Sequence, residues 1–289
     1  MTRIALLTPD PTDPSYASKW PGVRDRLSAA LAGAGIEAVA TPWTDHVTGA
    51  AGLTGFSLVL PMIVWGYHRD HPRWLQACAT WTAAGLPLAN PTSVLAWNSD
   101  KAYLGRLAGR GVPMPETIWS DAVTTATVVA AFDTTGAERL IVKPTVSAGA
   151  WQTQLVSRGQ IPTDLPTEAA MIQPYLPTIE TAGETSLIFF GDRFSHAINK
   201  RPATGDFRIQ DQYGGLYTPL VQPPAAALAL AQQVLAAIDE PLLYARIDMV
   251  PDGDGRWLLM EAELIEPDIY LDHAPDGGAA FARAVRARL

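Results

Sequence analysis

Apolar residues in the first hundred positions fall into short runs separated by stretches with helical spacing. The short runs predict buried strands at residues 4–7, 36–40, 56–60 and 86–89. Between them, apolar side chains recur every three or four positions over residues 20–34 and 74–84, which predicts two helices, each followed by a glycine stop. This alternation favours a small parallel α/β domain whose strand-end loops are open to a ligand.

Near the C-terminus, two alternating runs at residues 243–250 and 256–264 flank a Pro-Asp-Gly-Asp-Gly turn and predict a hairpin. Period-two alternation places Asp248 on one face of its strand, and Glu261 and Glu263 on one face of the partner strand. If Asp248 pairs with Glu261, three carboxylates gather on one surface. Their repulsion would be relieved by a hard cation such as Mg²⁺; the alternative is a solvent-facing acidic edge.

Composition narrows the function classes. The 289 residues, 48% of them hydrophobic and 17% charged, predict a compact globular protein of one to three domains. A net charge of -8 argues against a nucleic-acid partner. No apolar stretch reaches membrane-spanning length and no signal peptide is evident, so we expect a cytoplasmic protein with a small-molecule substrate and no membrane partner. The lone Cys78 excludes an intrachain disulfide framework, and a homo-oligomer is compatible with the sequence.

Two lysines, one at the end of a predicted strand and one at the start of a predicted helix, are placed where they could bind phosphate. Lys143 ends an apolar strand, beside Pro144, and enters the small-residue loop 145–150, where backbone N–H groups can close over phosphate oxygens. Lys101 starts a predicted helix over 101–109, so it is either simply solvated or directed at an anion. The chain contains no Walker phosphate-binding motif.

Further polar residues stand at predicted loops and strand ends. Glu184 begins a predicted hairpin over 183–200, as a ribose ligand or a plain surface residue. The loop 200–215 carries Lys200 and Arg208, cations suited to carboxylate or phosphoryl groups. The strand-end loops of the first domain offer candidate substrate contacts, or side chains that pack a domain interface: Asp10, Tyr16, Trp65 and His68.

In this order and spacing, the motifs resemble the ATP-grasp superfamily, over essentially the whole chain. The set comprises Lys101, Ile-Val-Lys143-Pro, Gly183-Glu184, Gly205-Asp-Phe-Arg208, Asp248 and Glu261-x-Glu263. It is most similar to the branch that holds bacterial glutathione synthetase and the enzymes that add glutamate to ribosomal protein S6. Residues 205–210 and 263–271 also resemble cyclo-ligases that make D-cycloserine from O-ureido-D-serine.

The resemblance implies an α/β (α+β) architecture, the ATP-grasp fold. A parallel α/β domain over residues 1–97 would precede a central subdomain over 98–175 and a C-terminal subdomain over 176–289, and the last two would clamp ATP. The ligands it implies are ATP and Mg²⁺, with two metal ions. The third metal position is commonly Asn in the family, and the extra charge of Glu263 either favours a second ion or leaves one carboxylate out of the coordination.

The resemblance also implies a role for each site residue. Phosphates would be bound by Lys101 and Lys143 under a loop that contains Ser147 and Gly149. Adenine would be read by the linker residues Gln173, Pro174, Tyr175 and Leu176. Ribose would be held by Glu184, with Glu180 as a rival. Mg²⁺ would be held by Asp248, Glu261 and Glu263. Arg208, with Lys200 nearby, would bind the substrate oxygen that is phosphorylated.

The implied function is an Mg-ATP-dependent ligase that forms a C–N bond on a small amino-acid-like substrate through a phosphorylated intermediate. The specific reaction that the resemblance implies is the cyclisation of O-ureido-D-serine in antibiotic biosynthesis. The alternatives are a carboxylate–amine or peptide ligase of another pathway, a kinase that stops at phosphoryl transfer, and a regulatory ATP-binding protein without turnover.

Overall fold

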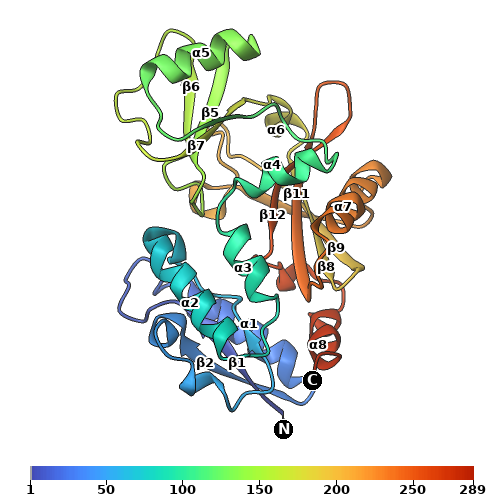
Figure 1. The fold of residues 1–289 in the computed structure, drawn as a ribbon. Helices are drawn as coiled ribbons and strands as arrows, with labels where there is room; N and C mark the ends of the chain where they lie inside the picture. Colours follow the sequence, from blue (N-terminus) through green and yellow to red (C-terminus); the bar gives the residue numbers. More distant parts are fainter. Residues whose placement is uncertain (1) are drawn as a thin grey trace.

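The computed structural model describes residues 2–289, arranged as three sheets with helices around them (Figure 1). The strands are β1 Thr2–Thr8, β2 Ile36–Pro42, β3 Val59–Leu60, β4 Ile118–Ser120, β5 Arg139–Pro144, β6 Gln154–Ser157, β7 Ala170–Pro174, β8 Glu184–Phe190, β9 Arg193–Arg201, β10 Leu216–Leu220, β11 Tyr244–Pro251 and β12 Trp257–Glu263. The α-helices are α1 Trp20–Ala32, α2 His71–Ala83, α3 Thr92–Asn98, α4 Tyr103–Gly109, α5 Thr125–Thr135, α6 Thr178–Thr181, α7 Ala225–Ile238 and α8 Ala279–Arg286. Short 3₁₀ helices are η1 Trp43–His46, η2 Ala51–Leu53, η3 Tyr67–Asp70, η4 Asp211–Tyr213 and η5 Leu271–His273.

The N-terminal sheet is parallel, with β1 between β2 and β3. Its central strand is buried from Ile4 to Thr8 because helices and loops cover both faces, as a continuous apolar run requires. The parallel α/β prediction is therefore confirmed. The predicted fourth strand over 86–89 is wrong: this segment makes only an isolated bridge between Leu88 and Val59. Pro87 has no N–H to donate, which limits the pairing there.

The second sheet has the order β4-β7-β5-β6 and is antiparallel throughout. Helix α5 covers it and packs Val128 and Phe132 against the strands. The helix begins at a capping box formed by Thr124 and Thr127, and ends at Gly136, whose φ of 65° suits a residue without a Cβ. This sheet holds Lys143 at the end of β5.

The third sheet has the order β10-β9-β8-β11-β12, also antiparallel. Its β11–β12 hairpin pairs Asp248 with Glu261, which confirms the register that the sequence suggested. A bulge follows Asp248 between β11 and β12. The alanine-rich helix α7 packs on this sheet through Ala227, Leu230, Ala231, Val234 and Ile238.

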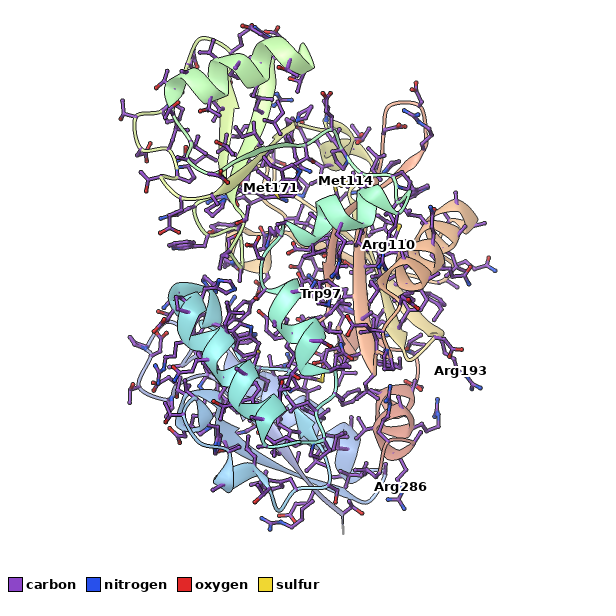
Figure 2. The ribbon with its side chains drawn as sticks, in the orientation of Figure 1. Trp97, Arg110, Met114, Met171, Arg193 and Arg286 are labelled. Carbon is purple, nitrogen blue, oxygen red and sulfur yellow. The ribbon has the colours of Figure 1, made fainter. Side chains whose placement is uncertain are left out.

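Helices α3 and α4 connect the three sheets. A shared core cluster joins α4, β7, α7 and the five-stranded sheet, with Trp97 and Met114 at its margin (Figure 2). The Asn98 side chain hydrogen-bonds to the backbone of β12, and the C-terminal helix α8 returns to pack against α1 and β8 (Figure 1). These contacts hold the N-terminal domain against the five-stranded sheet. The domain boundaries after residues 97 and 175 stay a prediction.

None of the helices within residues 2–289 combines the length and apolar character that crossing a bilayer needs.

Candidate active site

The acidic face of the β11–β12 hairpin is neutralised by protein cations. Asp248 is fully enclosed and accepts hydrogen bonds from Ser186 Oγ at 2.6 Å and from Arg246 Nη2 at 3.0 Å. Glu263 pairs with the same guanidinium. Burial alone would raise the pKa of Asp248, but Arg246 and then Lys200 lower it far below its usual range. This carboxylate is therefore ionised at any physiological pH.

Lys200 lies between two carboxylates. Its Nζ is 2.6 Å from Glu184 Oε1 and 3.1 Å from Asp248 Oδ2, and both pairs are almost completely buried. Burial would lower the pKa of Lys200, but the two carboxylates hold it well above its usual value. The strand register explains the contact, because β8 lies between β9 and β11 and pairs Glu184 with Lys200 and Ser186 with Asp248.

Lys101 and Lys143 lie where the second sheet faces the hairpin. Lys101 Nζ donates to the Ser147 carbonyl oxygen at 2.8 Å and is 2.9 Å from Glu261 Oε1. Lys143 has no ion pair and no side-chain hydrogen bond within residues 2–289, and burial, followed by the charge of Lys101, lowers its pKa. The sequence placed Lys101 at a helix start; it lies in the turn just before α4. Two ammonium groups, one of them unpaired, make this point suited to a polyanion.

The loop that follows Lys143 has an unusual backbone. Gly149, Ala150 and Gln152 all adopt left-handed conformations, with φ of 59°, 61° and 54°. For Ala150 and Gln152 such a conformation costs about 1–3 kcal/mol each, and strained loops of this kind cluster at ligand sites. Ser147 Oγ donates to the Pro144 carbonyl oxygen and holds the start of the loop against β5.

The linker after β7 is stabilised by its own side chains. Gln173 donates to Thr117 Oγ1 at 2.9 Å, and the Tyr175 hydroxyl donates to Glu180 at 2.6 Å. Arg139 stacks over the Tyr175 ring at 4.2 Å. The two ribose candidates therefore occupy different surroundings: Glu180 stands beside the linker, which also contains Pro174 and Leu176, whereas Glu184 belongs to the Lys200 cluster.

Arg208 lies in a separate loop. Its guanidinium pairs with Asp206 at 2.8 Å and lies 3.6 Å from the centre of the Tyr213 ring. The loop is tied to its neighbours, since Gln212 donates to the Gly149 carbonyl oxygen and Asp211 pairs with Lys19 of the N-terminal domain. No contact joins Arg208 to Lys200 or Asp248 in residues 2–289.

The substrate candidates of the N-terminal domain form two groups. Tyr16 packs on Trp65, with ring centres 5.7 Å apart. His68 packs on Trp151 of the loop after β5, at 5.8 Å, and its buried Nδ1 has no hydrogen-bond partner. Burial lowers the pKa of His68 to about 4, so the imidazole is neutral at physiological pH. The Asp10 carboxylate accepts hydrogen bonds from the backbone N–H and the hydroxyl of neighbouring Thr12.

The sequence suggested no role for Arg246, yet its guanidinium forms ion pairs with both Asp248 and Glu263. The available signal was its position two residues before Asp248, which puts both side chains on the same face of β11. A buried guanidinium at this point adds a fourth cation to Lys101, Lys143 and Lys200.

The carboxylate oxygens of the hairpin are chemically suited to a hard cation such as Mg²⁺, and Asp248 and Glu261 are direct cross-strand neighbours. Nevertheless, no three His, Cys, Asp or Glu side chains in the described part of the chain form a metal-binding group. The carboxylates are turned toward Lys101, Lys200 and Arg246 instead. The three-carboxylate magnesium site therefore stays a prediction.

Comparison with known proteins shows what this chain is similar to. A family model described as D-cycloserine synthetase DcsG, N-terminal domain, matches residues 4–90. The cycloserine biosynthesis protein DcsG of Streptomyces lavendulae is 29% identical over 278 residues, covering 88% of this chain and 90% of that protein. A crystal structure of D-cycloserine synthetase DcsG superposes with a TM-score of 0.81 at 25% identity, with 99% of both chains covered. The ATP-grasp ligase PsnB superposes with a TM-score of 0.69 at 15% identity, over 100% of this chain and 99% of that one.

The chain has the fold of the ATP-grasp ligases. The resemblance, the ATP-grasp fold and the mixed α/β class read from the sequence are thereby confirmed. The protein is an ATP-dependent ligase, as its similarity to DcsG over most of the chain indicates. The roles of the individual residues are proposals, which follow.

Proposed function

We propose that this protein is an Mg-ATP-dependent ligase that cyclises O-ureido-D-serine to D-cycloserine. The observation that carries the proposal is the grouping of Lys101, the unpaired Lys143 and the acidic hairpin at one junction of the sheets. Similarity to DcsG over most of the chain supports the choice of substrate. The same junction would serve another carboxylate–amine ligase, so the substrate needs a direct test.

The nucleotide would lie between the second and third sheets. Lys101 and Lys143 would meet its phosphates, and the loop containing Ser147 and Gly149 would cover them. The backbone of residues 173–176 would contact adenine, with Glu184 or Glu180 at the ribose. PsnB has also been solved with Mg and ADP, which supports ATP and Mg²⁺ as the ligands of this fold.

The protein's own groups would prepare the substrate carboxylate for phosphoryl transfer. Mg²⁺ held by Asp248, Glu261 and Glu263, in our proposal as two ions, would neutralise the phosphates when bound. Arg208 offers a guanidinium group that would stabilise the negative oxygens of an acyl phosphate. The nitrogen on the side-chain oxygen of O-ureido-D-serine would then displace phosphate and close the ring, and water would remove the carbamoyl group. ATP as a substrate is in keeping with the cytoplasm, which stays our expectation for its location.

The test is phosphate release across a panel of substrates, with mass spectrometry of the products. We expect phosphate release that depends on O-ureido-D-serine and a product with the mass of D-cycloserine. A stable phosphorylated product would identify a kinase instead. If the protein binds nucleotide but turns over no carboxylate and amine pair, a regulatory ATP-binding protein is favoured. If turnover requires a separate amine substrate, the protein is a carboxylate–amine ligase of another pathway.

A further inference from the structure

Arg208 is held by two neighbours, one on an edge of its guanidinium group and one on a face. Its Nε and Nη2 donate hydrogen bonds to the two carboxylate oxygens of Asp206, at 3.0 and 2.8 Å. The ring of Tyr213 lies against the group, with its centre 3.6 Å from Arg208 Cζ. Because the Arg208 side chain is 33% exposed, a ligand from solution can reach it.

The position of Tyr213 is fixed by the backbone of its own turn. Tyr213 ends η4, and its N–H donates to the Gln210 carbonyl oxygen at 3.0 Å. The N–H of Gly215 donates to the same oxygen at 3.2 Å. A Cβ on Gly215 would lie 1.9 Å from the Ile209 carbonyl oxygen, so the chain can close this tightly only with a glycine there. The ring of Tyr213 therefore keeps its place without help from Arg208.

The same turn is tied to the two parts of the molecule that face the expected cleft. Gln212 Nε2 donates to the carbonyl oxygen of Gly149, at 3.4 Å, in the loop proposed to cover the phosphates. Asp211 pairs with Lys19 of the N-terminal domain at 3.1 Å. Tyr213 follows these two residues in the chain, so its turn lies beside the proposed phosphate loop.

Asp206, unlike Tyr213, can change its relation to Arg208 at little cost. Its Oδ1 also accepts hydrogen bonds from the backbone N–H groups of Phe207 and Arg208, at 2.7 and 2.9 Å. These bonds stay in place if the guanidinium group leaves, and water can reach the carboxylate because the Asp206 side chain is 22% exposed. An ion pair that water can reach is weak, so a stronger partner can displace Asp206.

The charge of the guanidinium group explains why its partner has to change. While Arg208 is paired with Asp206, its single positive charge is already neutralised. A second oxyanion on the same group would lie close to the Asp206 carboxylate and be repelled by it. The negative oxygens of a phosphorylated intermediate need that positive charge for themselves. Arg208 can therefore serve the substrate only when the contact with Asp206 is given up, and the Tyr213 ring is then the neighbour that remains.

We propose that Tyr213 is the positioning residue that keeps Arg208 in place when its partner changes from Asp206 to an oxyanion of the substrate. Contact with the ring face fixes the plane of the guanidinium group without using its N–H donors, so these stay available to the new partner. Asp206 competes with the substrate for the same donors. The inference rests on the proposed function for the role of Arg208, and it names the residue that orients this arginine.

Two ligands and four single variants test the proposal by calorimetric titration. O-ureido-D-serine is titrated with Mg²⁺ and a non-hydrolysable ATP analogue present. Inorganic phosphate is titrated with Mg²⁺ and ADP present, so this arm does not depend on the identity of the substrate. The variants are Tyr213→Leu, Tyr213→Phe, Asp206→Asn and a charge control, Asp192→Asn, in the exposed turn between β8 and β9. Arg208→Met, with and without Tyr213→Leu, shows whether Tyr213 acts through Arg208.

The two positions should change binding in opposite directions. Tyr213→Leu should raise the Kd of both ligands about fivefold, the order expected for a partly exposed cation–π contact. Tyr213→Phe keeps the ring and should bind within about twofold of the wild type. Asp206→Asn keeps the acceptor for the two backbone N–H groups and removes the competing charge, so both Kd values should fall about threefold. Asp192→Asn should change neither, and Tyr213→Leu should have no further effect in Arg208→Met.

The proposal is overturned if Tyr213→Leu leaves both Kd values unchanged, or if Tyr213→Phe binds as weakly as Tyr213→Leu. A further loss of phosphate binding when Tyr213→Leu is added to Arg208→Met would also overturn it. Weaker binding by Asp206→Asn would do the same, because Asp206 would then orient Arg208 instead of competing for it. If the expected changes occur with phosphate in a protein that does not bind O-ureido-D-serine, the role of Tyr213 is supported and the proposed substrate is contradicted.

Discussion

Replacing Lys143 by methionine separates phosphate binding from folding. Lys143 forms no ion pair in residues 2–289, so Lys143→Met removes no native charge contact. It also removes a half-buried ammonium whose pKa is lowered by desolvation, so we expect the melting temperature to stay the same or rise. If the ammonium binds ATP phosphates, the loss of one hydrogen bond to a charged group costs about 1.5–3 kcal/mol. That corresponds to roughly 10- to 150-fold in the Kd for ATP.

Calorimetric titration with ATP and with adenosine checks this prediction, alongside thermal unfolding. Adenosine has no phosphates, so its Kd should change less than twofold, an estimate that assumes independent contacts. Lys101→Met is the matched control: it removes the pair with Glu261 and the hydrogen bond to the Ser147 carbonyl, so it should lower both ATP affinity and melting temperature. If Lys143→Met weakens the binding of ATP and adenosine equally, the reasoning is refuted. Lys143 would then support the fold or contact the nucleoside rather than the phosphates.

Three further outcomes follow from the charges of the site. Glu261→Gln should lower turnover by orders of magnitude while circular dichroism stays unchanged, and undiminished activity at limiting Mg²⁺ would contradict a metal-binding role. Lys200→Met leaves Glu184 and Asp248 buried without their shared cation, so urea unfolding should show a loss of about 3–5 kcal/mol, and an unchanged midpoint would contradict the pairing. Burial raises the pKa of Glu266 from 4.5 to about 7, so the folded state binds more protons than the unfolded state in that window and stability falls as pH rises through it. Glu266→Gln should reduce that fall between pH 4.5 and 7 in denaturation measurements, and identical pH slopes would show that the group is not buried in this way.

Local periodicity was sufficient to predict the hairpin that carries the acidic residues. Alternation fixes which side chains share a face, and the tight turn fixes the register, so the pairing of Asp248 with Glu261 follows from residues close in sequence. The strand that ends at Lys143 and the hairpin that begins at Glu184 were predictable for the same reason. The segment 86–89 was not, because its apolar run is short and Pro87 cannot extend the ladder.

The ion-pair network could not be read from the sequence, since its members come from distant strands. Lys200 and Asp248 are 48 positions apart, and their contact depends on the order of the five-stranded sheet. Arg208 is a different case: the sequence placed it as a substrate ligand, whereas the structure pairs it with Asp206 two residues away. Its proposed role therefore requires that contact to be exchanged for one with the substrate.

The central claim is that the substrate carboxylate is phosphorylated before the ring closes. O-ureido-D-serine labelled with ¹⁸O in both carboxyl oxygens tests it directly, because ring closure leaves one of these oxygens in the product and transfers the other to phosphate. The account predicts that phosphate released during wild-type turnover carries one ¹⁸O atom, with one ¹⁸O in D-cycloserine. Unlabelled phosphate from the same reaction would mean that ATP is hydrolysed by water, and would contradict the phosphorylated intermediate.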